Sequence, residues 1–99
     1  MDKIPADLVG SWIKLDAAPQ AEEYPDVLRI EPSGIYRGGS AGERRFLIWD
    51  DGTVRKVRSD RLAISTATDA IVDYSFRLAD DVLEITTPEA LVLRYRRGP

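Results

Sequence analysis

Residues 8–15 read Leu8-Val9-Gly10-Ser11-Trp12-Ile13-Lys14-Leu15 and contain a Gly-x-Trp motif inside an extended, largely apolar stretch. Alternate side chains of a strand share one face, which places Gly10 and Trp12 together. A glycine at this position lets a neighbouring backbone come close, and an indole is large enough to fill one end of a core. The stretch therefore predicts the first strand of a barrel-like domain, with Gly10 and Trp12 as a structural plug.

The rest of the chain has the pattern of short strands separated by turn residues. The clearest strand covers 70–79, where Val72, Tyr74, Phe76 and Leu78 alternate with polar neighbours. Pro32-Ser33-Gly34 predicts one hairpin turn, and Asp50-Asp51-Gly52 predicts a second, of the type I′ class. The expected strands are 8–15, 27–31, 35–37, 44–50, 53–58, 61–66, 70–79, 82–87 and 90–97. This spacing indicates an all-β, antiparallel meander of about eight strands that closes into a small barrel, with residues 1–99 as a single domain.

Three short motifs resemble those of the small calycin-type barrels, the group that contains the lipocalins and the streptavidin-like proteins. They are Gly10-Ser11-Trp12, Gly34-Ile35-Tyr36 and Tyr95-Arg96. The resemblance implies that Trp12 closes one end of the barrel beneath an arginine from the last strand, for which Arg96 is the first candidate and Arg94 the second. The chain departs from true lipocalins because it is much shorter, has no cysteine and lacks the flanking helix. No residues match the biotin-contacting positions of streptavidin.

The composition excludes several classes of site and partner. The chain has no Cys and no His, which removes thiolate nucleophiles, Ser-His-Asp triads and the usual zinc and haem ligand sets. The net charge of -3 argues against a general nucleic-acid partner. Its short apolar runs predict neither a signal peptide nor a membrane segment, so we expect a cytoplasmic protein. Asp50-Asp51 and Asp80-Asp81 are two-residue turns with too few oxygen ligands for calcium, and we expect no metal and no cofactor.

Two classes of binding function remain open. The first is a small apolar or aromatic ligand inside the barrel, with Tyr36, Tyr74, Phe76 and Tyr95 as candidate ligand-binding residues and a tyrosine hydroxyl to orient the ligand. In the alternative, the large inward side chains simply fill the interior, and the domain acts through a protein partner or as a homo-oligomer. That alternative draws on aliphatic residues expected on the outer face. These are Ile35, Leu47, Val57, Ile71, Val82 and Val92.

An enzyme is the third class, and we do not favour it. Without His or Cys, acid–base chemistry would depend on Tyr, Arg or carboxylates. The best local grouping is Asp73-Tyr74 with Glu84 and Arg94 on neighbouring strands, but alternation points Asp73 away from Tyr74. The acidic, proline-containing segment 16–26 is expected to be a surface loop and is the best candidate for a lid.

Overall fold

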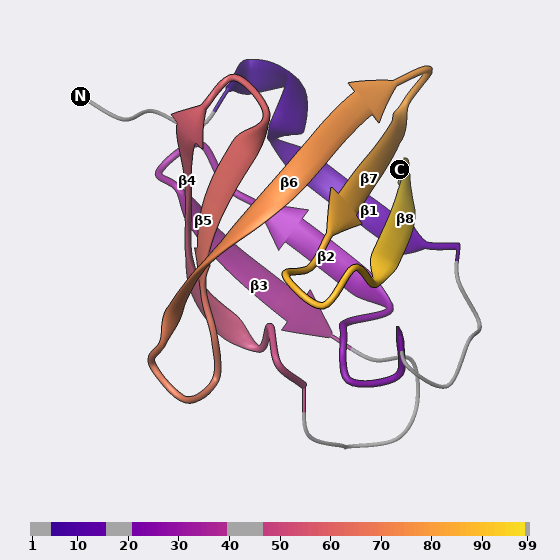
Figure 1. The fold of residues 1–99 in the computed structure, drawn as a ribbon. Coiled ribbons are helices and arrows are strands. Elements are labelled where there is room, and N and C mark those ends of the chain that lie inside the picture. The colour runs from indigo at the N-terminus through magenta and orange to yellow at the C-terminus, as the bar shows by residue number, and fades with distance from the viewer. Residues whose placement is uncertain (1–4, 16–20, 40–46, 99) are drawn as a thin grey trace.

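The chain forms a closed antiparallel barrel of eight strands in sequence order (Figure 1). The computed structural model describes residues 5–15, 21–39 and 47–98. A short 3-10 helix, η1 (Ala6–Leu8), precedes the first strand. The strands are β1 (Gly10–Lys14), β2 (Val27–Ile30), β3 (Ile35–Gly39), β4 (Asp51–Arg58), β5 (Arg61–Ser65), β6 (Ile71–Ala79), β7 (Val82–Thr86) and β8 (Val92–Arg97). The predicted all-β meander is confirmed, and β1 closes the barrel by pairing with both β2 and β8.

The up-and-down order gives the barrel two different ends. Helix η1 and the turns β2–β3, β4–β5 and β6–β7 lie at one end, which we call the plug end. The chain segments at 21–26, 47–50, 66–70 and 87–91 lie at the opposite end, which we call the mouth. Every inward side chain therefore belongs to the plug end, the interior or the mouth according to its place along its strand.

The interior between the two ends is filled by the protein's own side chains. Trp12, Tyr36, Leu62, Leu83 and Tyr95 each expose 0% of their surface. A cavity large enough for one water molecule would leave accessible surface on the side chains around it. These side chains have none, so they pack directly against one another as in other close-packed cores.

The segment 44–50, predicted to be a strand, is not one over its described part. Residues 47–50 are not part of the sheet and cross the mouth just before β4 begins. Residues 44–46 lie outside the described residues. Leu47, expected on the outer face of the barrel, is buried, and so is Trp49. Strand alternation does not apply to this segment, because its backbone bonds are isolated ones and do not form a strand ladder.

The predicted type I′ turn at Asp50-Asp51-Gly52 is also absent, since Asp51 and Gly52 belong to β4. Glycine is needed at position 52 because neighbouring side chains pack against its backbone, and not because the chain turns there. A Cβ built on Gly52 would lie 2.1 Å from Ser65 Oγ and 2.9 Å from a ring carbon of Tyr36. The glycine therefore lets Tyr36 and β5 approach the backbone of β4.

Within the described ranges, no helix has the length and apolar character that crossing a membrane would require.

Candidate functional site

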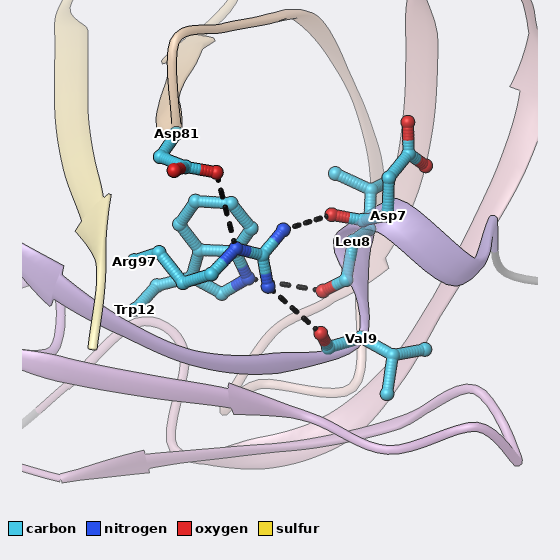
Figure 2. A network of polar contacts seen from close by, with 6 residues as sticks. All are labelled: Asp7, Leu8, Val9, Trp12, Asp81 and Arg97. Atoms are coloured by element: carbon cyan, nitrogen blue, oxygen red, sulfur yellow. Dashed lines mark hydrogen bonds and ion pairs between the residues drawn. The ribbon is translucent and has the colours of Figure 1, made fainter. Parts of the chain in front are cut away.

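The plug end is held together by an arginine stacked on the first-strand tryptophan (Figure 2). The guanidinium carbon of Arg97 lies 4.4 Å from the centre of the Trp12 ring. Trp12 Nε1 donates a hydrogen bond to the Leu8 carbonyl at 3.0 Å. Arg97 donates to the carbonyls of Asp7 at 2.6 Å and Val9 at 3.1 Å, and its Nε faces the Asp81 carboxylate at 3.5 Å. One cation thus joins η1, β1, β8 and the β6–β7 turn.

The stacking arginine is Arg97, and the expectation that Arg96 or Arg94 holds this position is wrong. Leu93 and Tyr95 point inward, and strand alternation brings Arg97 to the same face while Arg94 and Arg96 are exposed. Arg97 also pairs directly with Trp12 in the sheet. Gly10 was expected to admit a neighbouring backbone, but the group that approaches it is the Arg97 side chain, since a Cβ on Gly10 would lie 3.2 Å from Arg97 Nη1.

The mouth is spanned by the irregular segment 47–50. The backbone of Ile48 is bonded on both sides, since its N–H donates to the Glu23 carbonyl at 2.6 Å and its carbonyl accepts from Ala67 N–H at 2.8 Å. The backbone carbonyl of Asp50 then accepts a hydrogen bond from the Gly38 N–H at 2.5 Å. A Cβ on Gly38 would lie 2.0 Å from the Trp49 carbonyl oxygen, so the crossing requires glycine at this position of β3.

Lys14 ties the segment 21–26 to the barrel wall. Its ammonium donates to the carbonyls of Ala21 at 2.7 Å and Tyr24 at 3.0 Å, and it lies 3.1 Å from an oxygen of Asp26. The side chain is only 6% exposed. A buried ammonium is stable when its donors are satisfied and its charge is paired, which is the case here. Lys14 therefore fixes the position of Tyr24 at the mouth.

Three aromatic rings pack edge to face beneath the crossing segment. The Trp49 ring lies 4.8 Å from Tyr24 and 5.2 Å from Tyr74, centre to centre. Trp49 Nε1 donates to the Tyr74 hydroxyl at 3.2 Å. Burial raises the pKa of Tyr24 to about 12 and also raises the pKa of Tyr74. Both phenols therefore keep their protons at neutral pH.

A hollow of about 290 Å³ lies beside this aromatic group and is open to solvent. We call it the mouth pocket. Its lining combines two tyrosine rings, aliphatic side chains and the two hairpin turns of the mouth. The lining residues are Tyr24, Ile48, Thr66, Ala67, Thr68, Ala70, Val72, Tyr74, Pro88 and Glu89. A second hollow, of about 550 Å³, adjoins it and shares Tyr24, Ile48 and Glu89.

Of the four candidate ligand-binding residues, Tyr74 alone is among those lining the mouth pocket. The hydroxyl of Tyr36 donates to the Ser65 carbonyl at 2.6 Å, and that of Tyr95 donates to the Pro25 carbonyl at 2.8 Å. Both rings are fully buried. Phe76 lies toward the plug end, beside residues of η1 and the β4–β5 turn. The structure therefore does not bring these four side chains into one site.

Sequence reasoning missed the role of Tyr24, Ile48, Trp49 and Lys14. For Lys14 a signal existed, because Gly10, Trp12 and Lys14 alternate onto one face of β1. The other three lie outside regular strands, where no periodic pattern indicates which side chains turn inward.

The structure separates the grouping considered for catalysis. Tyr74 is buried on the inner face, whereas Asp73 is exposed on the outer face of β6. Glu84 and Arg94 form a 3.2 Å ion pair, also between exposed or half-buried side chains. Across residues 5–15, 21–39 and 47–98, no three carboxylates gather where they could hold a metal ion.

Comparison with known proteins gives no match, whether to a protein-family model, a curated protein or a solved structure.

Proposed function

We propose that this barrel binds a small apolar or aromatic molecule in the mouth pocket. The observation that carries the proposal is the contrast between a filled interior and an open hollow with aromatic and aliphatic walls at one end. Small-molecule sites are concave, mostly apolar and supplied with a few polar groups, and they often occupy the mouths of β-barrels. A volume of about 290 Å³ accommodates a molecule of one or two rings.

Tyr74 supplies the polar group that orients the ligand. Its hydroxyl accepts the Trp49 N–H, and among the described residues the hydroxyl proton has no acceptor of its own. Because Tyr74 lines the pocket, we expect this hydroxyl to donate to a carbonyl or hydroxyl oxygen of the ligand.

We further propose that the chain is a minimal barrel of the calycin type. The support is the Gly10-x-Trp12 motif on the first strand, the helical turn before it and the stacking of Arg97 from the last strand on Trp12.

The ligand proposal is tested by titrating the ¹⁵N-labelled protein with a set of neutral aromatic fragments that includes tryptophol. We expect saturable amide shifts concentrated at Ala67, Val72 and Glu89. Ala67→Phe, which places a ring in the pocket, should abolish these shifts, and the control Ala79→Phe at the plug end should leave them unchanged. No saturable shift at the mouth with any fragment, or binding that Ala67→Phe does not weaken, would overturn the proposal.

Association between copies of the chain is the second candidate function. Ile13 and Val27 are paired across β1 and β2 on the outer face, and Leu15 follows on the same face. Leu15 and Val27 expose 49% and 42% of their surface. Sedimentation measurements test this candidate. It requires that the wild type is a dimer and that the Val27→Lys variant is a monomer.

A further inference from the structure

We propose that the ligand of the mouth pocket is an organic cation, an amine carried on an aromatic or aliphatic body. This inference rests on the proposed function and adds the charge of the ligand. It follows from the acidic side chains around the pocket. Glu89 lines both hollows of the mouth, and Glu23 lines the second one. The described residues that line the two hollows include no Lys or Arg.

The same hollows are lined by tyrosine and glutamate residues. Tyr24 and Glu89 line both hollows, Tyr74 lines the first and Glu23 the second, so a ligand bound there has phenol rings and carboxylates among its neighbours. A cation near an aromatic face is attracted by the ring's quadrupole, and a carboxylate adds direct Coulomb attraction. An anion at the same place meets repulsion from both glutamates.

The electrostatic environment of the phenols agrees with this geometry. Burial is the largest cause of the raised pKa of both phenols. For Tyr24 the neighbouring Tyr74, Glu89 and Glu23 contribute next, in that order, and for Tyr74 the negative charge of Glu89 contributes as well. The Lys14 ammonium, which bonds the Tyr24 carbonyl, is paired with Asp26. Among the described residues, the side chains that line the two hollows therefore contribute a negative electrostatic potential, and the charge of Lys14 beside them is paired with Asp26.

Three ligands that share an indole ring separate the effect of charge from that of shape: tryptamine is a cation, tryptophol is neutral and indole-acetate is an anion at neutral pH. Calorimetric titration at low ionic strength should give tryptamine an affinity about three- to tenfold above tryptophol, and indole-acetate the weakest binding. The advantage of tryptamine should shrink as salt is added, because both carboxylates face solvent.

The glutamates are tested by isosteric variants. Glu89→Gln and Glu23→Gln should each reduce the preference for tryptamine over tryptophol and leave tryptophol affinity within about twofold. Glu31→Gln is the matched control, since it removes one negative charge at the plug end, where Glu31 pairs with Arg37.

The outcomes distinguish the two proposals. If tryptophol binds at the mouth and tryptamine binds no more tightly, the cation inference is overturned while the proposed function stands. If a tryptamine preference survives in the Glu23→Gln, Glu89→Gln double variant, the assignment to these carboxylates is overturned. If none of the three ligands binds, the cation inference is overturned. The titration with the neutral fragment set then shows whether the proposed function, binding of a small molecule in the mouth pocket, fails as well.

Discussion

A single side chain near the end of β8, that of Arg97, joins several elements at the plug end of the barrel. Arg97 stacks on Trp12, donates to two carbonyls next to η1 and faces Asp81. The carbonyls of Asp7 and Val9 lie at the junction of helix and strand, where the sheet offers them few partners. The guanidinium has enough donors in a fixed plane to serve both, which a lysine could not do in the same geometry.

Replacing Arg97 should destabilise the fold far more than replacing its neighbour. Arg97→Gln loses the cation–π contact and the hydrogen bonds to the carbonyls, for an expected cost of about 1–3 kcal/mol. Arg96→Gln, at an exposed position, should change stability by less than about 0.5 kcal/mol. Urea unfolding of the two variants measures both values, and equal effects would contradict the role given to Arg97.

At the scale of the elements, the mouth uses the same hairpin design twice. In the β5–β6 turn, Thr66 N–H donates to the Ala70 carbonyl and Asp69 N–H donates to the Thr66 carbonyl. In the β7–β8 turn, Thr87 and Ala90 make the corresponding bonds. The equivalent residues Asp69 and Ala90 both have positive φ, at 63° and 69°. Aspartate tolerates this conformation better than alanine, because its side chain can bond locally to the backbone.

Ala90→Gly should therefore stabilise the protein, by about 0.5–1 kcal/mol. Glycine removes the steric cost of the left-handed conformation, which exceeds the entropy it adds to the unfolded chain. Ala79→Gly, at an exposed position in β6, is the control and should destabilise the protein by a similar amount. At this position glycine relieves no left-handed conformation and only adds conformational entropy to the unfolded chain. Thermal unfolding of both variants gives the sign, and a loss of stability in Ala90→Gly would show that the turn is not strained.

For the whole molecule, buried phenols make stability depend on alkaline pH. Tyr24, Tyr36 and Tyr74 all have raised pKa values, with burial as the largest cause. Each must keep its proton in the folded state, whereas the unfolded chain releases it near the ordinary tyrosine value of about 10. Above that value the unfolded state binds fewer protons than the folded state, so the free energy of unfolding falls as pH rises.

The barrel should keep its full tyrosine-linked stability below about pH 10 and lose it progressively toward the folded-state pKa, which for Tyr24 is about 12. Denaturant unfolding between about pH 8 and pH 12 measures the slope, and phenolate absorbance reports the titration. Tyr24→Phe should make the slope shallower, because one linked proton is removed. A free energy of unfolding that stays constant over this range would contradict the burial of these phenols.

Most residues of the candidate site could not be predicted from periodic patterns in the sequence. Tyr74 belongs to a long alternating strand, so its inward position could be predicted from the sequence. Ile48 and Trp49 lie in the segment 47–50, whose course depends on hydrogen bonds to Glu23, Ala67 and Gly38. These partners are 12 to 25 residues away in the chain from the residues that they bond. Such bonds leave no periodic signal, so the sequence pattern predicts another strand here.

Apart from the segment 44–50, the antiparallel meander and the buried position of Trp12 follow from the sequence, because strand alternation and turn residues are local properties. The sequence also contained the signal for Arg97, which the Leu93 and Tyr95 alternation places inward. The packing roles of Gly38 and Gly52, and the place of the open hollow at the mouth, follow from the three-dimensional arrangement of the strands. These features depend on how side chains from distant strands fill a closed volume, and that filling is a property of the whole barrel.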